Sequence, residues 1–259
     1  FSLISCARSC IFTDLKLTHF WKILNSSIAR VSKTDDDYDY PEDLPVVKIN
    51  RFKSFRAMET AELYNQSGED LLYSSMFCQL WKELRQYSDE KLRISYTHPM
   101  DDGQSRTFKI KFEGEGVDDY GGPYREIFQK LCEELQAQDP SSKNFIKQST
   151  ESLLSGEKAS RPCFLPILFP TLNWNAGDDC LERYKYIFNS SSVSPIRLDL
   201  FTFLGQLVGI ALRSKITLDL PLASYIWKSV VREPLTEKDI ASFDITSSNF
   251  ITYLSSLYN

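Results

Sequence analysis

Cysteine and histidine are the residue types in this sequence that could supply a nucleophile or hold a metal ion, and the chain has six cysteines and two histidines. His19 and His98 have no neighbours at the spacings typical of a nucleophile–base pair or a zinc site. No two cysteines form a Cys-x-x-Cys pair. We therefore expect no metal site, no cofactor, and reduced thiols that are mostly buried. The cysteines are Cys6, Cys10, Cys78, Cys132, Cys163 and Cys180.

Other catalytic patterns are weak or missing in the sequence. There is neither a glycine-rich phosphate loop nor a Gly-x-Ser-x-Gly turn. Adjacent carboxylates occur at 101–102, 118–119 and 178–179, but neighbouring side chains usually point apart, which disfavours paired acid–base catalysis. A hydrolase that uses Cys163 or Cys180 stays open as an alternative, although no histidine lies near either residue in the sequence.

The composition is that of an ordinary globular protein, and the length fits one large domain or two modest ones. The 259 residues have a mass of 29.9 kDa; 42% are hydrophobic and 25% are charged. The formal net charge is −5 and no basic stripe stands out, which argues against nucleic-acid binding. The longest apolar run, 200–212, is too short for a transmembrane segment and contains Gln206. No secretory signal is visible, so we expect a cytoplasmic protein.

Segment 112–128 has the most unusual residue types, and it lies between a predicted strand and a predicted helix. Its glycines allow positive φ and tight turning, and its aspartates can accept backbone N–H bonds around the turn. The arginine and glutamate that follow can pair with neighbouring charges. Backbone N–H groups at the helix start could bind phosphate, but acidic residues crowd the turn, so we interpret the segment as a structural corner. Its main residues are Gly114, Glu115, Asp118, Asp119, Gly121, Gly122, Arg125 and Glu126.

Hydrophobic periodicity predicts the elements that position this corner. Apolar residues at helical spacing predict a helix over 72–84, and alternation predicts a β-hairpin of 92–96 and 108–112 with a long loop. Pro123 is well placed to begin the next helix. The glutamates of that helix that should point toward water are Glu126, Glu133 and Glu134.

The second half of the chain is predicted to be helical. Residues 198–212 are apolar nearly all round, which predicts a central core helix, and Gly205 and Gly209 should let another element approach its backbone closely. Further helices are predicted from Pro221 and, behind a capping box, from Thr236. The side chains expected to face inward from the first of these are Tyr225, Ile226, Trp227 and Val230. The predicted class is α+β, mainly helical with small antiparallel β elements.

Two of these segments resemble the HECT family of ubiquitin ligases. Residues 112–128, Phe-Glu-Gly-Glu-Gly-Val-Asp-Asp-Tyr-Gly-Gly-Pro-Tyr-Arg-Glu-Ile-Phe, are similar to the family's Gly-Glu-x-Gly-x-Asp-x-Gly-Gly-x-x-Arg-Glu-x-Phe signature. Residues 201–212 are similar to its Phe-x-Phe-x-Gly-x-x-x-Gly-x-Ala helix, and 219–222 and 235–239 continue the family's order. The resemblance covers residues 70–259, and the acidic turn looks closest to the very large HECT ligases that carry RCC1-like repeats.

The resemblance implies a two-lobed transferase. In this family the N-lobe docks a ubiquitin-conjugating enzyme (E2), and a C-lobe cysteine takes ubiquitin as a thioester and passes it to a lysine of a protein substrate. Residues 1–70 would be an extension before the HECT domain, with an acidic linker at 34–45, and residues 71–259 would be part of the N-lobe. The last helix lies where the E2-docking surface should begin, which makes its apolar residues candidates for E2 binding: Phe250, Tyr253, Leu254 and Leu257.

The chain by itself is expected to be an inactive scaffold part of such a ligase. The family's catalytic cysteine follows His-Thr, and none of the six cysteines has that context. The chain starts at Phe1 and stops within a helical pattern, so we expect a fragment without the catalytic lobe. Two alternatives stay open. The last helix could simply pack into the lobe, or the protein could be a non-enzymatic helical module that binds partners through the basic, aromatic segment Val46–Ala57.

Overall fold

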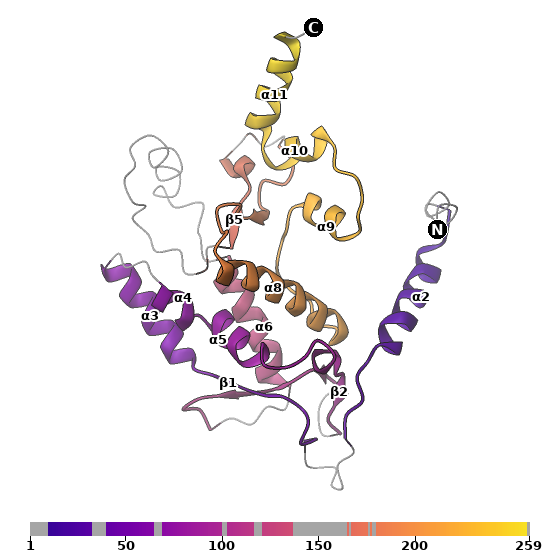
Figure 1. Cartoon of the computed structure of the whole chain (residues 1–259), viewed down its shortest axis with the longest axis vertical. Coiled ribbons are helices and arrows are strands. Elements are labelled where there is room, and N and C mark those ends of the chain that lie inside the picture. Colours follow the sequence, from indigo (N-terminus) through magenta and orange to yellow (C-terminus); the bar gives the residue numbers. More distant parts are fainter. Residues whose placement is uncertain are drawn as a thin grey trace.

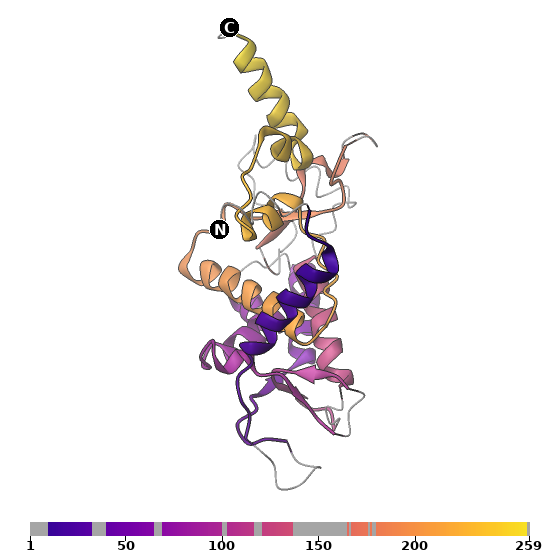
Figure 2. The ribbon, with the colours of Figure 1, turned by 90° about the vertical axis from the view of Figure 1, so that its right-hand side faces the viewer.

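The computed structural model describes residues 10–32, 40–64, 69–99, 103–116, 121–136, 165, 167–175, 177 and 180–257 (Figure 1). In these residues the protein is mainly helical, and its strands form three separate two-stranded sheets. The predicted α+β class is confirmed. Figures 1 and 2 show an elongated molecule whose central helix, α8 (Pro195–Arg213), separates a lower part with the first two sheets from an upper part that ends in the C-terminal helix.

The lower part is built on a parallel pair of strands with helices packed on one face. Strand β1 (Val46–Ile49) pairs with β4 (Lys109–Phe112). Their inward side chains are buried against helices α5 (Met76–Leu84) and α6 (Gly122–Leu135) and form part of the core. The sequence had predicted antiparallel elements only. The pair is parallel because helices α3 (Arg51–Tyr64), α4 (Glu69–Ser74) and α5 lie between the strands and bring the chain back to the same end.

The predicted hairpin of 92–96 and 108–112 is wrong, because these two segments do not pair with each other. Residues Lys91–Arg93 form a short 3-10 helix, η1, and only β2 (Tyr96–Thr97) pairs antiparallel with β3 (Ser105–Arg106). Strand β4 pairs with β1 instead, because Ile110 and Phe112 then join the inward residues of β1 in the core.

The helix predicted over 72–84 is present as two helices that meet at Ser75. The Oγ of Ser75 accepts a hydrogen bond from the backbone N–H of Cys78 at 3.1 Å and so caps α5. The predicted apolar face of this segment is confirmed by its burial. Its buried residues are Leu72, Met76, Phe77, Cys78, Leu80, Trp81 and Leu84.

Helix α6 begins with Pro123 in its first turn, as predicted, but the expectation that Glu134 faces water is wrong. Glu134 is 5% exposed, whereas Glu133 is exposed. The Glu134 carboxylate accepts hydrogen bonds from the N–H groups of Met76 and Phe77, both at 2.9 Å, and from Ser54 Oγ at 2.7 Å. The first N–H groups of a helix have no acceptor within the helix. The Glu134 carboxylate supplies acceptors for two of these N–H groups of α5, and it joins α5 to α3 and α6. Burial raises the pKa of the Glu134 carboxyl above its usual value.

Helix α8 is the core helix that its composition predicted. Its buried residues include Phe203, whose ring contacts that of Phe77 on α5 with centroids 5.2 Å apart. By length and composition alone α8 could cross a membrane, but it packs against α5 and η1 as part of the core. The expected close approach at Gly205 and Gly209 is wrong. Apart from the residues flanking each glycine and the backbone of α8 itself, no atom of the described residues lies within 4 Å of a Cβ placed at either glycine, because both lie on the side of α8 turned away from the core.

The residues at and just after the end of α2 (Thr13–Ser26) contact the lower part and the end of α8. Ala29 forms a β-bridge with Ile94, and Arg213 donates to the Leu24 carbonyl at 3.1 Å and to Ser27 Oγ at 3.0 Å. The rest of α2 stands apart from α8 and has no buried residue (Figure 1). Of the acidic segment 34–45, residues 40–45 are described. Pro41, Leu44 and Pro45 are buried and Tyr40 is stacked on His98, whereas Glu42 is exposed. The boundary between residues 1–70 and 71–259 stays a prediction.

The upper part contains strands β5 (Leu168–Pro170) and β6 (Tyr186–Phe188), the 3-10 helix η2 (Leu172–Asn175), and helices α9 (Ser224–Val230), α10 (Glu237–Phe243) and α11 (Ile245–Leu257). The helix predicted from Pro221 begins at Ser224, and of its four expected inward residues only Ile226 is buried. Trp227 and Val230 are 44% and 70% exposed, because this short helix is covered on one side only.

Replacing Glu134 by alanine should lower the free energy of unfolding by about 1–3 kcal/mol, because two buried N–H groups of α5 lose their acceptor. Chemical denaturation followed by circular dichroism measures this value. The matched control is Glu133→Ala on the exposed side of the same helix, which should change the free energy of unfolding by less than about 0.5 kcal/mol. Equal effects of the two variants would contradict the role of Glu134.

Candidate partner-docking site

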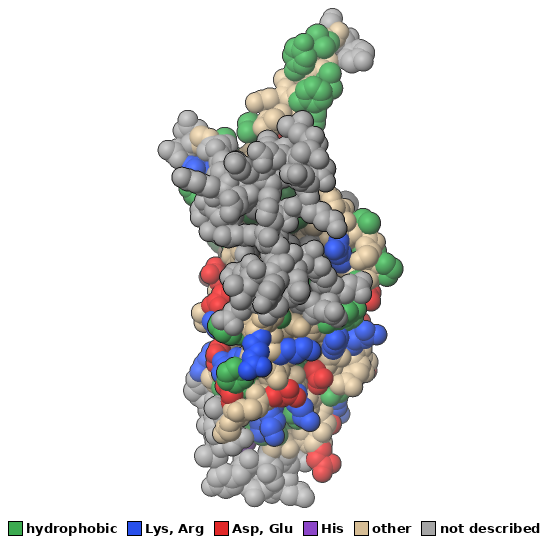
Figure 3. Space-filling view, turned by 90° about the vertical axis from the view of Figure 1, so that its left-hand side faces the viewer, with side chains coloured by type: hydrophobic (Ala, Val, Ile, Leu, Met, Phe, Trp, Pro, Cys, Tyr) green, Lys and Arg blue, Asp and Glu red, His purple; other side chains and the backbone are tan. Residues whose placement is uncertain are grey.

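Helix α11 presents apolar side chains to solvent, and none of its described residues is buried. The exposed fractions are 60% for Phe250, 59% for Tyr253, 38% for Leu254 and 61% for Leu257. The helix projects from the upper end of the molecule, and hydrophobic side chains cover its visible side in Figure 3. In this structure the four side chains therefore do not pack into the body of the protein. Exposed apolar residues at helical spacing are typical of a surface that binds a partner.

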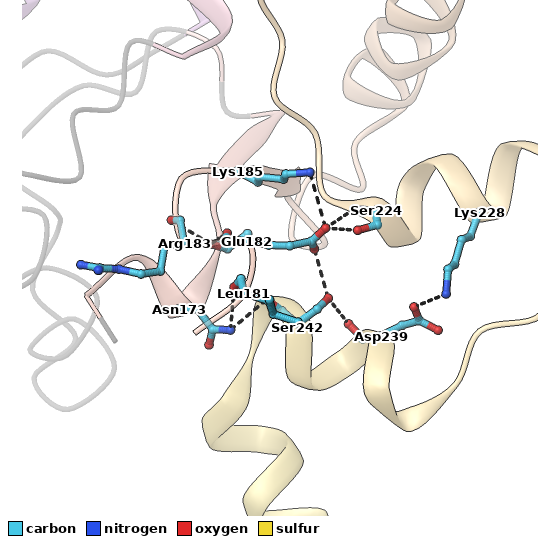
Figure 4. A network of polar contacts seen from close by, with 10 residues as sticks. Asn173, Leu181, Glu182, Arg183, Lys185, Ser224, Lys228, Asp239 and Ser242 are labelled. Carbon is cyan, nitrogen blue, oxygen red and sulfur yellow. Dashed lines mark hydrogen bonds and ion pairs between the residues drawn. The ribbon is translucent and has the colours of Figure 1, made fainter. Parts of the chain in front are cut away.

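The direction of α11 depends on Asn173, a residue of η2 that is 1% exposed (Figure 4). Its Nδ2 donates to the carbonyls of Ala241 and Ser242 at 3.1 and 2.9 Å, and its Oδ1 accepts the N–H of Ile245 at 2.8 Å. One amide group thus binds the last carbonyls of α10 and the first N–H of α11, which lack partners within their helices. The turn between the two helices is fixed by this side chain.

Glu182 joins α9 and α10 to the loop that leads into β6. Its Oε1 accepts hydrogen bonds from the N–H of Ser224, at 2.8 Å, and from the hydroxyl of the same residue. Its Oε2 lies 3.0 Å from Ser242 Oγ, and Lys185 Nζ lies 3.6 Å from Oε1. A single carboxylate therefore connects the start of α9 with the end of α10, as Figure 4 shows.

Asp239 stabilises the start of α10 and is 8% exposed. Its carboxylate accepts a hydrogen bond from Lys228 Nζ at 2.6 Å and, in the predicted capping box, one from the N–H of Thr236 at 2.7 Å. These contacts, led by the bond from Lys228, lower the pKa of Asp239 to about 2. The predicted capping box is confirmed, and it also ties α10 to α9.

The glycine corner at 112–128 is anchored by Arg51. Gly114 and Gly121 have φ of 81° and 104°, values that favour glycine. The Arg51 guanidinium binds the carboxylates of both Glu115 and Glu126 and lies over the ring of Phe112 at 4.1 Å. Arg51 holds the pKa of the Glu115 carboxyl below its usual value.

The remaining residues of the corner add no catalytic arrangement. Gly122 starts α6, Arg125 is exposed in its first turn, and Asp118 and Asp119 lie outside the described residues. The contacts around Arg51 connect α3, the end of β4 and α6. They fit a structural corner better than a phosphate site.

Two cysteines are unsuited to nucleophilic attack. Burial raises the pKa of the Cys78 thiol to about 12 and that of Cys132 to about 11, so both stay protonated at neutral pH. Cys10 is exposed and Cys180 is half-buried, whereas Cys6 and Cys163 lie outside the described residues. In the described part of the chain no group of three or more Cys, His, Asp or Glu residues could hold a metal ion.

Sequence reasoning missed Asn173, which fixes the turn into α11, and Glu182, which connects α9 with α10. Asn173 had a usable signal, because it is a lone amide within the mostly apolar stretch 167–174 and such a group must find partners when buried. Glu182 had none. Its role follows from its contacts with Ser224 and Ser242, which lie 42 and 60 positions further along the chain. Its backbone φ is positive, at 55°, and its side chain lies against α9 and α10.

The upper part should be sensitive to acid through Asp239. Its folded-state pKa of about 2 lies below the usual aspartate value of 3.8, so this group contributes stability that is present above pH 4 and is lost as the pH falls toward 2. Acid titration of the far-ultraviolet circular dichroism at fixed temperature measures the loss. Asp239→Asn should be less stable at neutral pH and should show a smaller change between pH 4 and 2. The same acid profile in both proteins would contradict this assignment.

Comparison with known proteins gives a consistent result. Residues 168–259, which include α8, the residues around Glu182 and α11, match the family described as HECT-domain (ubiquitin-transferase). The E3 ubiquitin-protein ligase HERC2 of Mus musculus is 30% identical over 200 residues, which cover 77% of this chain and 3% of that protein. The probable E3 ubiquitin-protein ligase HECTD4 of Homo sapiens is 29% identical over 260 residues, which cover 99% of this chain and 5% of that protein.

The chain spans only a few per cent of the length of these relatives, so they are very large proteins, as the acidic turn had predicted. The expected likeness to ligases that carry RCC1-like repeats stays a prediction. Of the two sequence motifs, the helix at 201–212 lies within the matched residues 168–259, and the glycine corner lies within the longer alignment with HECTD4. Residues 168–259 therefore form part of a HECT domain, and over most of its length the chain is similar to very large E3 ubiquitin-protein ligases.

Proposed function

We propose that this chain is the E2-docking and scaffold part of an E3 ubiquitin-protein ligase, and that α11 contributes to the docking surface. The observation that carries this proposal is the exposed apolar face of α11 inside the HECT match. Its partners are a ubiquitin-conjugating enzyme charged with ubiquitin and, through the rest of the ligase, a protein substrate. The proposed location is the cytoplasm.

The reaction of the ligase is acyl transfer through a covalent enzyme intermediate. A cysteine thiolate of the ligase attacks the thioester between the E2 cysteine and the ubiquitin carboxyl group, and the E2 thiolate leaves. A substrate lysine amine then attacks the new thioester, forms an amide bond and releases the ligase cysteine. The chain's role is to bring the charged E2 to a fixed position, which lowers the entropic cost of the first transfer.

The accepting cysteine is proposed to lie outside these 259 residues. Cys78 and Cys132 are buried with raised pKa values, and none of the six cysteines follows His-Thr. The buried thiols and the scaffold contacts of Arg51 support a structural role for the lower part. On this proposal the chain alone forms no ubiquitin thioester.

Substitutions on α11 test the docking role. The double variant Phe250→Ala and Leu257→Ala should weaken binding of the cognate E2 by at least about tenfold, since truncating central apolar residues of an interface often costs more than 1.4 kcal/mol. Binding is measured by biolayer interferometry with a panel of E2 enzymes. The matched control is Leu15→Ala and Phe20→Ala on α2, which are also exposed apolar residues and should leave E2 binding unchanged.

Asn173→Ala gives a second arm, because it leaves every side chain of α11 in place. Loss of the amide that fixes the α10–α11 turn should also weaken E2 binding, whereas Asn25→Ala on the exposed side of α2 should not. An E2 that binds the chain equally well after the α11 and Asn173 substitutions would overturn the assignment of this surface. A reducible ubiquitin adduct on the unmodified chain in a non-reducing gel would overturn the proposed absence of the accepting cysteine.

A further inference from the structure

A second exposed surface lies on the lower part, far from α11, and consists of the outer face of β1 and β4 with the first turns of α3. Its lysines are Lys48 on β1, Lys111 on β4 and Lys53 on α3, and all three are exposed. Two aromatic residues of α3, Phe52 and Phe55, are 60% and 61% exposed. The side of the molecule on which α3 lies shows many Lys and Arg side chains across its lower half, with hydrophobic and some Asp and Glu side chains among them (Figure 3).

The lysines of this surface are not neutralised within the described residues. None of Lys48, Lys53 and Lys111 forms an ion pair there. Glu115 and Glu126 are close in sequence and space, but both bind Arg51. Glu113 contacts Asn50 and is the one further carboxylate that the contacts place beside this surface. The local charge is therefore positive, although the chain as a whole has a net charge of −5.

The pairing of β1 with β4 places two of these charges side by side. Lys48 is the register partner of Lys111, and both side chains point to the exposed face of the sheet. Neighbouring strands lie about 4.8 Å apart, and like charges directly opposite each other destabilise a sheet. An anionic partner that binds both lysines would remove this repulsion, so the arrangement favours the bound state over the free one.

The same surface offers room for an apolar side chain. A hollow of about 500 Å³ is lined by Asn50, Phe52, Lys53 and Arg56. The hollow is open to solvent and has room for one aromatic ring. The phenyl ring of Phe52 can supply apolar contact, while Lys53 at the rim can bind a carboxylate beside the ring.

We propose that the outer face of β1 and β4 with the start of α3 is a docking surface for an acidic peptide segment of another protein that carries one aromatic side chain. The acidic residues complement the three unpaired lysines, and the aromatic side chain enters the hollow beside Phe52. A short segment contacts only this local positive surface, whereas a nucleic acid would extend over a protein whose overall charge repels it. The surface lies at the opposite end of the molecule from α11, so it can be occupied while α11 is bound, and it does not depend on the E2-docking role.

Fluorescence anisotropy with the whole chain and labelled synthetic peptides tests the proposal. The probe is a peptide of aspartates and glutamates with one central phenylalanine, and a second peptide has serine in place of that phenylalanine. Lys48→Glu with Lys111→Glu should weaken binding of both peptides by at least about tenfold. The control pair Lys22→Glu and Lys238→Glu has the same change in net charge on exposed residues elsewhere and should have little effect.

The aromatic contribution has its own control. Phe52→Ala with Phe55→Ala should weaken the phenylalanine peptide by at least about fivefold and the serine peptide by much less, since only the former fills the hollow. Phe250→Ala with Leu257→Ala on α11 should leave both peptides unaffected. An equal loss for both peptides would contradict an aromatic site in the hollow.

The single variant Lys111→Glu distinguishes a direct loss of peptide binding from a loss caused by misfolding. Lys111→Glu replaces a repulsive cross-strand pair with an attractive one, so it should raise the melting temperature while it weakens peptide binding. A loss of binding through misfolding would instead lower the melting temperature. No binding of the phenylalanine peptide up to about 1 mM, or equal losses in both charge-reversal pairs, would overturn the proposal. Displacement of the peptide by phosphatidylserine vesicles or duplex DNA as effectively as by unlabelled peptide would assign the surface to another class of ligand.

Discussion

The packing of the lower part depends on the position of one carboxylate, that of Glu134. Helix α5 starts inside the protein, where N–H groups without acceptors would cost free energy, and Glu134 supplies acceptors to Met76 and Phe77 from the neighbouring helix α6. The same group binds Ser54, so α3 is fixed as well. Strands β1 and β4 and helix α8 all pack against α5 or α6. The positions of the parallel sheet and of the central helix therefore depend on the contact that holds α5 and α6 together. Burying a carboxylate costs free energy, but here both oxygens of Glu134 accept hydrogen bonds.

The upper part is held together differently from the lower part. Below α8, a continuous set of buried apolar side chains packs from β1 to α6. Above it, α9 joins the same core through Ile226 and contacts α10 through the rings of Tyr225 and Phe243. The described residues of α11 are all at least partly exposed, and polar contacts of Asn173, Glu182 and Asp239 add to the connections among these helices. Segments with few buried apolar contacts open at lower free energy than the core. The candidate docking helix is therefore oriented by a few hydrogen bonds on a less stable part of the fold, where a bound partner can add stability.

Much of the fold was predictable from the sequence because it follows local rules. The helical spacing from Leu72 to Leu84, Pro123 at the start of α6 and the capping box at Thr236 each depend on neighbours within a few residues. The errors concern long-range partners. Glu134 has the sequence context of an exposed helical glutamate, and only the start of α5 and the hydroxyl of Ser54 make it a buried one. The apolar residues of α11 were identified from their spacing, but Asn173, which orients that helix, and Glu182, which connects α9 with α10, act across long sequence separations.

The parallel pairing of β1 with β4 has a consequence for how the chain folds as it is synthesised. Val46 is the register partner of Lys109, so the pair closes a loop of about 60 residues. Strand β1 leaves the ribosome first and has no partner strand until β4 follows, so Val47 and Ile49 are aggregation-prone during that interval. A polypeptide that begins at residue 71 lacks β1 altogether. Its strand β4 then presents an unpaired edge beside Ile110 and Phe112, a template for pairing between molecules rather than within one.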